Sequence, residues 1–352
     1  MDGVNVVRFR YAPAWLEVLV NDGGIVSNLQ RSPWKYCLVP FFLLSMSFAL
    51  FRLRLTLRPD VIHAHWLIPQ GLIAGLLCFG AGRTPILLTC HGADLFALRG
   101  RVVSWVKRWV FSRVSHTTVV SEGMRKIALD AGAKGDSLTV QPMGVDLADS
   151  FTPAPVTERR QEELLFVGRL VEKKGLRYLI EALSIAIGKR PELSLTVAGF
   201  GPEEAELKRQ VGRLGIEAHV RFLGAVSQTE LPSLYRRAAI FVAPFVEAAS
   251  GDQEGLGLVV IEALGCGCPV IVSDLPATRD LPLCDSFRAA PGNVMQLAER
   301  IEYVLGMPKA DLEIAIETAR DTLVSRYDWS AVGNGYAHLI GDLAERRDET
   351  ES

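Results

Sequence analysis

Two glutamates, Glu254 and Glu262, enclose a glycine-rich turn in the segment Glu254-Gly-Leu-Gly-Leu-Val-Val-Ile-Glu262. Gly255 and Gly257 allow the backbone to turn just before an apolar helix, so backbone N–H groups and the positive end of that helix face outward. Two carboxylates beside such amides suit a ligand that carries both phosphate and hydroxyl groups. A plain surface carboxylate would be the simpler interpretation of one glutamate, but the glycines and the apolar strand that follows favour a binding site.

Two cations follow another expected strand. Arg169 comes directly after Leu165-Phe-Val-Gly168, and Lys174 lies five residues further on, where Gly175 opens a helix. In α/β folds, the end of a parallel strand and the start of the next helix form an anion site. A reaction that releases a diphosphate needs fixed cations or a metal at such a place. A solvated loop is the alternative, and the neighbouring Lys173 fits that description.

Several further segments occur in the order typical of one family. Together with the Glu254–Glu262 segment they resemble the retaining glycosyltransferases of family 4, which have the GT-B fold, and the resemblance covers nearly the whole chain. Each segment alone is weakly specific, but five in order with suitable spacing are strongly specific. They are His91-Gly-Ala-Asp94, Gly144-Val-Asp146, Gly168-Arg169…Lys174-Gly175, Gly199-Phe-Gly201-Pro202 and Phe222-Leu-Gly224.

The resemblance implies transfer of a sugar from a nucleotide-sugar donor with retention of anomeric configuration and without a cofactor or metal. In the family, the departing phosphate is thought to take the acceptor proton. The counterparts of Arg169 and Lys174 hold the diphosphate. Glu254 would contact the donor sugar, and Glu262 would accept hydrogen bonds from the ribose hydroxyls.

In the N-terminal half, the resemblance implies that His91 faces the donor sugar across a cleft between two domains. The alternative is that His91 is a core histidine. We therefore expect catalytic roles for His91, Glu254, Arg169 and Lys174. His65 and Asp94 are expected on the acceptor side. Further donor contacts, largely through backbone atoms, are expected at Gly168, Gly199, Gly201, Gly224, Val226, Gly255, Leu256, Gly257, Leu258 and Glu262. Met143 stands where the family usually has Asn before Gly-Val-Asp, so a side-chain hydrogen bond there is in doubt.

The elements that position these residues alternate along the chain. Continuous apolar strands with helices between them predict parallel sheets, buried on both faces. Two such runs, separated by a Pro-rich polar stretch after Ser150, predict two Rossmann-like domains. Expected strands are Val4–Phe9, Asp60–His65, Pro85–Cys90, His116–Ser121, Ser137–Gln141, Leu164–Val167, Leu193–Ala198, Val220–Phe222 and Ile240–Pro244, and expected helices include Pro69–Leu77, Ser121–Ala131, Leu176–Ile187, Glu203–Leu214 and Gln228–Arg237.

The sequence thus predicts an α/β protein of the GT-B class, with two parallel sheets facing across a cleft. Residues 1–150 would form the acceptor-side domain, 151–161 a linker and 162–325 the nucleotide-sugar-binding domain. Residues 326–352 would form a helix that crosses back to the first domain. The chain opens as if in the middle of a family 4 N-terminal domain, so we expect about one strand-helix-strand unit to be lacking there.

Charge is unevenly distributed. The chain has 38 Lys and Arg against 40 Asp and Glu; residues 1–150 hold 16 against 10, which leaves 22 against 30. A basic N-terminal half suggests an anionic partner, with a solvated face as the alternative. The apolar run Cys37–Phe51 is shorter than the ~18–20 residues that span a bilayer. We expect a buried helix, with peripheral contact to an anionic membrane as the alternative.

The six cysteines are scattered, and Cys266-Gly-Cys268 lacks the spacing of a metal knuckle or redox motif. This usage fits a reducing cytoplasm, and no metal site is expected. We predict a cytoplasmic enzyme, or one on the inner face of the membrane, with no nucleic-acid partner. It would act in cell-surface polysaccharide or glycolipid assembly on a saccharide or lipid-linked acceptor.

Two other functions remain open from sequence. A GT-B nucleotide-sugar epimerase would need acid and base carboxylates in the cleft, which the family 4 segments do not favour. A shortened, catalytically silent module would bind a nucleotide sugar or lipid carrier without transfer. Intact Arg169, Lys174, Glu254 and Glu262 support donor binding in either case, so the expected gap at the start of the chain is what separates transfer from silent binding.

Overall fold

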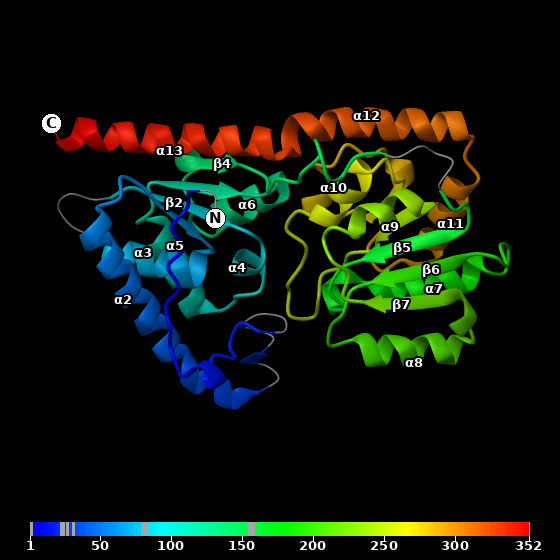
Figure 1. Ribbon diagram of the computed structural model, residues 1–352, viewed down its shortest axis with the longest axis horizontal. Helices are drawn as coiled ribbons and strands as arrows, with labels where there is room; N and C mark the ends of the chain where they lie inside the picture. Colours follow the sequence, from blue (N-terminus) through cyan, green and yellow to red (C-terminus); the bar gives the residue numbers. More distant parts are fainter. Residues whose placement is uncertain are drawn as a thin grey trace.

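The protein consists of two α/β domains with a pair of long helices running along both (Figure 1). The computed structural model describes residues 3–21, 25, 28–29, 32–78, 84–153 and 159–351, with side chains to residue 347. Residues 154–158 of the expected linker lie outside the described residues.

In the described part of the N-terminal domain, four parallel strands form a sheet in the order β1-β2-β3-β4. The central strand β2 is buried along its whole length, as expected for a strand covered on both faces. The pairs Ile62–Ile86, Leu88–Thr117 and Val119–Val140 set the register. The strands are β1 (Ile62–His65), β2 (Ile86–Cys90), β3 (His116–Val119) and β4 (Leu138–Val140), and the helices are α3 (Leu72–Leu77), α4 (Ala93–Phe96), α5 (Arg101–Phe111) and α6 (Glu122–Asp130).

The C-terminal domain, as far as it is described, has a parallel sheet of six strands in the order β10-β9-β8-β5-β6-β7. Its interior is a continuous apolar cluster in which side chains such as Leu164, Leu195 and Ile271 are fully shielded from solvent. The strands are β5 (Glu163–Val167), β6 (Ser194–Ala198), β7 (Val220–Gly224), β8 (Ile240–Ala243), β9 (Val270–Ser273) and β10 (Arg288–Ala289), and the helices are α7 (Leu176–Ala186), α8 (Glu204–Leu214), α9 (Leu231–Arg237), α10 (Leu258–Gly265) and α11 (Val294–Leu305).

The strand order reverses between β5 and β8. From β5 the chain builds outward to β6 and β7, and then returns to the other side of β5 with β8, β9 and β10. Ligands of such sheets bind in the crevice at the carboxyl ends of the strands, at this switch point. The loops that open there run from β5 to α7 and from β8 to α10, and they carry Lys174 and Glu254.

Two long helices connect the domains along one side of the molecule (Figure 1). Helix α12 (Lys309–Tyr327) lies along the C-terminal domain and α13 (Trp329–Glu351) along the N-terminal domain. Between them the chain meets its earlier passage from one domain to the other. The Val145 N–H donates to Tyr327 O at 2.8 Å, and the Trp329 N–H donates to Val145 O at 3.2 Å. The two passages between the domains are therefore hydrogen-bonded to each other.

The beginning of the chain differs from the sequence-based expectation. Val4–Phe9 was predicted to be a strand, but these residues form neither strand nor helix. Val4, Val6 and Val7 are exposed, and the Phe9 ring is tilted at 59° to the Phe42 ring with centroids 5.3 Å apart. The valines of this segment thus do not pair with a strand, because β-propensity reflects packing against neighbouring strands rather than an intrinsic backbone preference.

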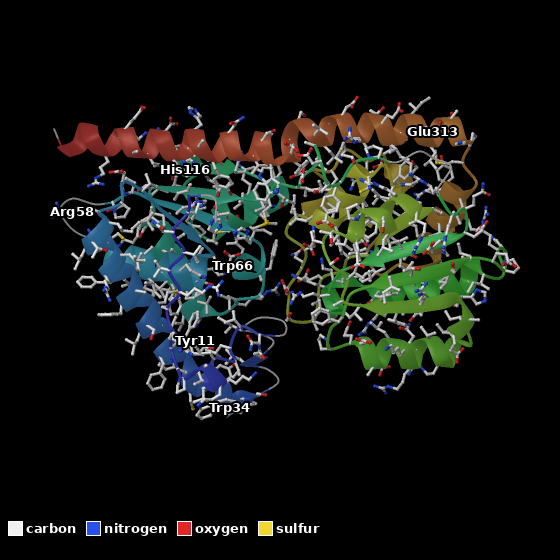
Figure 2. All side chains as sticks on the ribbon, viewed as in Figure 1. Tyr11, Trp34, Arg58, Trp66, His116 and Glu313 are labelled. Atoms are coloured by element: carbon white, nitrogen blue, oxygen red, sulfur yellow. The ribbon has the colours of Figure 1, made fainter. Side chains whose placement is uncertain are left out.

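The apolar run that follows is helical but not buried. It forms a 3₁₀ segment (Pro33–Leu38) and α2 (Val39–Leu57), and its buried residues are Leu38 and Phe42, which form a small apolar cluster with Leu19. Trp34 and Arg58 mark opposite ends of this helix on the outside of the molecule (Figure 2). Among the described residues, Pro33–Leu57 is a 25-residue helical stretch long and apolar enough to cross a membrane, judged by length and composition alone. The expectation of a short, buried helix was wrong on both points.

Candidate active site

Three glycines end neighbouring strands of the C-terminal sheet. Gly168 follows β5, Gly199 follows β6 and Gly224 ends β7, and their φ angles are 152°, 143° and 74°. Such positive values favour glycine. A Cβ atom on Gly199 would overlap the carbonyl oxygen of Gly168, and the Gly199 N–H donates to Gly224 O at 2.7 Å. The strand ends therefore present bare backbone, over which a flat ring can lie.

Two further predicted residues border this glycine edge. A Cβ atom on Gly201 would overlap the backbone of Leu170, so the β6–α8 loop depends on glycine to lie against the β5–α7 loop. Val226 is half-buried and packs against the apolar core. These positions shape the backbone of the edge.

Lys174 and Glu254 meet at the switch point. Lys174 Nζ lies 2.7 Å from Glu254 Oε2 and 4.7 Å from the centre of the Phe245 ring. Burial opposes ionisation of Glu254, but the charges of Lys174 and Lys173 outweigh it and lower the pKa of Glu254 to about 2. Glu254 is therefore an acceptor-only carboxylate at neutral pH. Arg169, the other predicted cation, is exposed on the same loop.

The turn after Glu254 is held in place by its backbone and by one apolar anchor. Leu256 is buried, and Gly257, with φ 79°, precedes the first residue of α10, Leu258. The Gly257 N–H donates to the Glu254 carboxylate, which is one reason for the low pKa of Glu254. The sequence led us to expect ligand-facing amides here, and one of them is already committed to Glu254.

Glu262 lies on α10 among polar partners that the sequence analysis did not identify. Its Oε2 accepts from the Tyr235 hydroxyl at 2.8 Å, and its Oε1 accepts from Gln228 Nε2 at 3.2 Å. Burial raises the pKa of Glu262, and these hydrogen bonds offset part of the rise. Tyr235 is fully shielded from solvent on α9. The sequence analysis placed Tyr235 within the expected helix Gln228–Arg237, and no sequence signal connected it to Glu262.

Three histidines line the opposite side of the site, at the ends of β1 and β2. His65 Nδ1 lies 3.0 Å from His91 Nε2, and the His63 and His65 rings are 4.2 Å apart. His91 Nδ1 lies 3.4 Å from Met143 Sδ. Burial, followed by the charge of His65, lowers the pKa of His91, so its ring is neutral at pH 7. The structure thus brings the predicted residues His65 and His91 together and adds Met143 as their neighbour.

We expected Asp94 on the acceptor side, but its carboxylate binds backbone amides of its own domain. Its side chain is buried, and its two oxygens accept from the backbone N–H groups of Leu67, His91 and Gly92 at 2.9, 3.2 and 3.0 Å. By accepting from three backbone amides, the short carboxylate fixes the turn after β2, and both of its oxygens are used in these hydrogen bonds. Asp94 is therefore a positioning residue for the His91 loop.

The two halves of the site touch. The Cα atoms of the His91–Gly92 turn lie against Gly255, where an added Cβ would overlap the His91 carbonyl oxygen. The Ser121 hydroxyl donates to Gly255 O at 2.8 Å. The loop that carries Glu254 is therefore in direct backbone contact with the loop that carries His91, and glycine is needed at position 255 for this approach.

The Gly144-Val-Asp146 segment lies at the junction of the two domains. It packs where the two interdomain passages meet, and a Cβ atom on Gly144 would lie 2.7 Å from the Trp329 ring. Asp146 accepts from the Asp149 N–H at 3.0 Å. The segment therefore fixes the junction between the domains.

The stretch before Glu254 ties the domains together. Glu247 pairs with Arg99 of the N-terminal domain at 3.0 Å, and Asp252 pairs with Lys173 at 3.1 Å. A cavity of about 360 Å³ lies beside this stretch, on the N-terminal side of the Glu254 loop, with Lys107 and Gln253 among its lining residues. Glu247 and Gly251 both contact Arg99, so this stretch connects the two domains.

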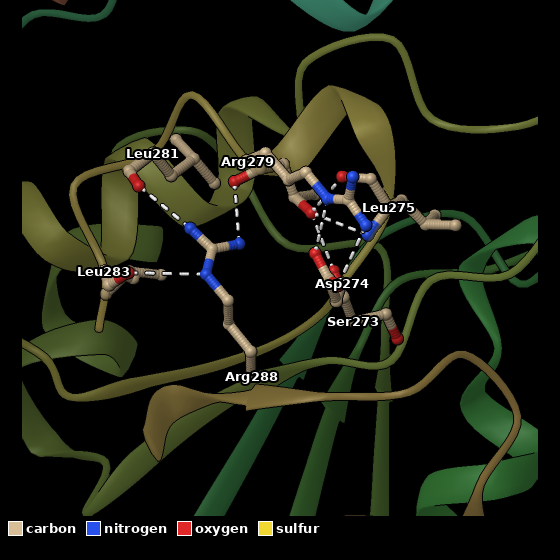
Figure 3. A network of polar contacts seen from close by, with 8 residues as sticks. Ser273, Asp274, Leu275, Arg279, Leu281, Leu283 and Arg288 are labelled. Atoms are coloured by element: carbon tan, nitrogen blue, oxygen red, sulfur yellow. Dashed lines mark hydrogen bonds and ion pairs between the residues drawn. The ribbon is translucent and has the colours of Figure 1, made fainter. Parts of the chain in front are cut away.

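A second bridge forms on the other side of the site. Arg288 is buried and donates to the carbonyl oxygens of Thr278, Leu281 and Leu283 at 3.0, 2.9 and 3.3 Å. Nearby, the Arg279 guanidinium holds both oxygens of Asp274, as Figure 3 shows. The loop so stabilised presents Asp280 to α6, where its carboxylate accepts from the Glu122 N–H at 2.6 Å. Arg288 gave no functional signal in the sequence because its partners are backbone atoms.

No group of three or more His, Cys, Asp and Glu side chains that could hold a metal ion occurs in the described ranges. The nearest approach at the site is the His65–His91 pair. The cations at the switch point are those of Lys173 and Lys174, with Arg169 on the same loop.

Two families of known proteins match the sequence. Residues 3–149 match the family described as Glycosyltransferase Family 4, and residues 151–322 match the family described as Glycosyl transferases group 1. A phosphatidyl-myo-inositol mannosyltransferase of Mycolicibacterium smegmatis is 32% identical over 279 residues, which are 78% of this chain and 68% of the relative. A glycogen synthase of Mycobacterium tuberculosis is 30% identical over 305 residues, 84% of this chain and 71% of the relative.

Solved structures share the arrangement of the domains. Anabaena HepE in complex with UDP and glucose superimposes with a TM-score of 0.68 at 20% identity, over 90% of this chain and 83% of that chain. The two parallel sheets and the elements around them define a two-domain Rossmann-like protein with the GT-B fold, which confirms the expected fold class. The chain belongs to the family 4, or group 1, glycosyltransferases.

Proposed function

We propose that this glycosyltransferase moves a hexosyl group from a nucleotide-sugar donor to a lipid-linked or saccharide acceptor, with retention of anomeric configuration. The observation that carries the proposal is the Lys174–Glu254 pair at the switch point, beside the glycine edge. A glycolipid acceptor is supported by the similarity to a phosphatidyl-myo-inositol mannosyltransferase. Cell-surface glycolipid or polysaccharide biosynthesis is the corresponding process.

In the proposed mechanism, Lys174 and Arg169 bind the diphosphate and stabilise the charge that it gains as the bond to the anomeric carbon breaks. Glu254, which is ionised, accepts a hydrogen bond from a hydroxyl of the donor sugar. Glu262 accepts from the ribose, and the glycine edge receives the base. His91 meets the sugar from the N-terminal domain. The departing phosphate takes the acceptor proton on the face where the new bond forms.

The experiment is a transfer assay with UDP-, GDP- and ADP-sugars, with the anomeric configuration of the product determined by NMR. Lys174→Ala and Arg169→Ala should each weaken nucleoside diphosphate binding by roughly 1.5–3 kcal/mol, the range for charged hydrogen bonds. Lys208→Ala is the control, because Lys208 is an exposed cation of the same domain that pairs with Glu204 on α8. Unchanged affinity of both variants for all three diphosphates would reject the site, and an inverted product would reject retention.

We also propose that no metal is required, because side-chain cations and backbone amides would neutralise the diphosphate. Turnover should persist in EDTA. Loss of turnover on chelation, restored by Mn²⁺, would contradict this part of the proposal and leave the assignment of the donor site intact.

Contact with an anionic membrane is proposed for α2, at the cytoplasmic face where a lipid-linked acceptor would be met. Its support is the exposure of Phe41, Leu44, Phe48 and Leu55, which are 58, 67, 67 and 60% exposed. Apolar side chains next to basic residues favour a lipid surface over water. The basic and aromatic residues at the ends of the helix include Trp34, Lys35, Arg52 and Arg58.

Sedimentation with vesicles tests the membrane contact. The protein should bind vesicles that contain phosphatidylglycerol more tightly than those of phosphatidylcholine alone. The double variant Leu44→Ser/Phe48→Ser should lose at least about tenfold in binding, since each side chain would bury apolar surface worth ~1.5–3 kcal/mol. Ile314→Ser on α12 is the control, because Ile314 is also an exposed apolar helix residue. Equal binding by the double variant would refute the assignment of α2.

The two alternatives make different predictions in the same transfer assay. A silent binding module would bind the donor without turnover, and an epimerase would convert the donor sugar without an acceptor. Glu254 is ion-paired and Glu262 is hydrogen-bonded to Tyr235, an arrangement that favours ligand binding over acid–base exchange.

A further inference from the structure

Both ring nitrogens of His91 are engaged within the N-terminal domain. Nε2 faces His65 Nδ1 at 3.0 Å, and Nδ1 faces Met143 Sδ at 3.4 Å. The Trp66 ring is tilted against the imidazole with a centroid distance of 5.3 Å, and the His65 ring is stacked at 5.2 Å. Four contacts from two chain segments therefore fix the plane of this ring and the direction of its nitrogens.

The contact with sulfur decides which nitrogen carries the proton. A thioether sulfur has no hydrogen and only accepts weakly, so the Met143 contact is a hydrogen bond only when Nδ1 of His91 is protonated. In the neutral ring, Nε2 then has a lone pair, which accepts the Nδ1–H of His65. The opposite tautomer would place a nitrogen lone pair against the sulfur lone pairs. The neutral tautomer that satisfies both contacts has its proton on Nδ1.

The groups around the ring keep it neutral. His65 is the nearest titratable side chain, and its charge would oppose a charge on His91. Asp94 is the facing carboxylate, and its charge raises the pKa of His91, but burial and the charge of His65 outweigh this effect. Both Asp94 oxygens accept from backbone N–H groups of its own loop and of Leu67. Met143 and Trp66 contribute no charge. At neutral pH the ring therefore offers one N–H, and that N–H rests on a weak acceptor.

We propose that Met143 and His65 are positioning residues that hold His91 with its proton on Nδ1, ready to donate to a hydroxyl oxygen of the donor sugar. This inference rests on the proposed function, because it needs the sugar to reach His91. The Met143 sulfur accepts from the N–H in this structure, and a hydroxyl oxygen of the sugar, which is the stronger acceptor, replaces it in the complex. His65 keeps its hydrogen bond to Nε2 throughout and so prevents a change of tautomer.

Donor binding depends on the fraction of molecules in which His91 has the required tautomer. If a ligand binds only one tautomer, its apparent dissociation constant equals the intrinsic constant divided by that fraction. Met143→Leu preserves apolar volume and removes the acceptor, so the fraction with the proton on Nδ1 should fall. The donor KM should rise by about two- to tenfold, while kcat at saturating donor should stay within about twofold.

The test combines imidazole NMR with kinetics on the full chain. In protein labelled with ¹⁵N-histidine, with His91 assigned by its absence in His91→Gln, Nδ1 of wild-type His91 should have the shift of a protonated nitrogen and Nε2 that of an unprotonated one at pH 7.5. Met143→Leu should move the two shifts toward each other, and His65→Leu should do the same. Met124→Leu is the control, because Met124 is a buried methionine of the same domain that does not contact His91.

Two outcomes would overturn the proposal: a wild-type His91 protonated on Nε2, or unchanged shifts and donor KM in Met143→Leu. Retention of the wild-type tautomer together with a fall in kcat alone would also overturn it, because that pattern indicates a purely structural role. The tautomer is measured without donor, so absence of transfer by the wild type would refute the proposed function while the NMR result still decided the positioning role.

Discussion

At the scale of single residues, the Lys174–Glu254 pair already has the charges that a donor would need. Both side chains are largely shielded, with 13 and 15% exposed, so removal of either partner leaves a poorly compensated charge. A phosphate competes with Glu254 for Lys174, and a sugar hydroxyl competes with Lys174 for Glu254. A nucleoside diphosphate satisfies the lysine alone, whereas a nucleotide sugar satisfies both, and this difference favours the complete donor over the released product.

This competition predicts opposite effects of Glu254→Gln on binding and on turnover. Affinity for a nucleoside diphosphate should rise about fivefold, because a competing ion pair worth ~1 kcal/mol is lost. Transfer should fall by about 10²-fold or more, since the amide no longer supplies a charged acceptor for the sugar. Calorimetry with UDP, GDP and ADP and a transfer assay give the two readouts. Glu172→Gln on the neighbouring loop serves as control, and weaker diphosphate binding by Glu254→Gln would contradict the competition.

The half-buried His63 predicts a loss of stability in mild acid. Burial, with smaller effects of His65 and His91, lowers the pKa of His63 from 6.5 to about 4. As pH falls from 6.5 to 4, the unfolded chain gains a proton at this position that the folded chain does not, so folding becomes less favourable in this window. His63→Gln should flatten the decline in the urea midpoint between these pH values. His338→Gln, at an exposed site on α13, should leave the slope unchanged; a wild-type slope in His63→Gln would disprove the attribution.

At the scale of elements, the sequence predicted what depends on local pattern. Strands β1–β8 lie where apolar, β-rich runs occur, because parallel strands covered on both faces must be apolar throughout. Contacts between distant segments could not be predicted. Tyr235 on α9 contacts Glu262 on α10, and Met143, which follows β4, contacts His91, which follows β2. Asp94 belongs to a segment that resembles the family, yet its carboxylate accepts from backbone amides. Sequence spacing does not indicate the direction of a side chain, so this could not be predicted.

The glycine edge predicts an unequal response to a single methyl group. Gly199→Ala would place a Cβ atom over Gly168 O at a φ of 143°, so we expect a loss of about 2–4 kcal/mol in the free energy of unfolding and loss of nucleotide binding. Gly215→Ala is the control: its φ is also positive, at 66°, but an added Cβ meets no atom within 4 Å. That variant should lose only about 1 kcal/mol. Denaturant titration and calorimetry compare the two, and equal losses would show that φ alone, rather than the close approach of the strand ends, requires glycine.

At the scale of the whole molecule, the site exists because two domains are held at a fixed separation. Contacts between them occur on both sides of the Glu254 loop: Arg99 with Glu247 on one side, and Glu122 with Asp280 on the other. Behind the site, Val145 is bonded to the junction of α12 and α13. The donor-binding residues belong to one domain and His91 to the other, so a change in separation should affect transfer more than nucleotide binding.

Gly123 provides the test of this separation. It lies at the start of α6, where a Cβ atom would come within 2.5 Å of the Pro276 backbone of the C-terminal domain. Because backbone cannot move aside as a flexible side chain does, Gly123→Ala should push α6 away and draw His91 from the donor. Nucleotide affinity should stay within about twofold, while transfer falls by about 10²-fold, the effect of roughly 1 Å of misplacement. Gly135→Ala, where an added Cβ meets only Leu129 at 4.0 Å, controls for the substitution within the same domain. A proportionate fall in nucleotide affinity and transfer would show that Gly123 supports the C-terminal site itself, and unchanged transfer would show that catalysis tolerates a wider cleft than this structure has.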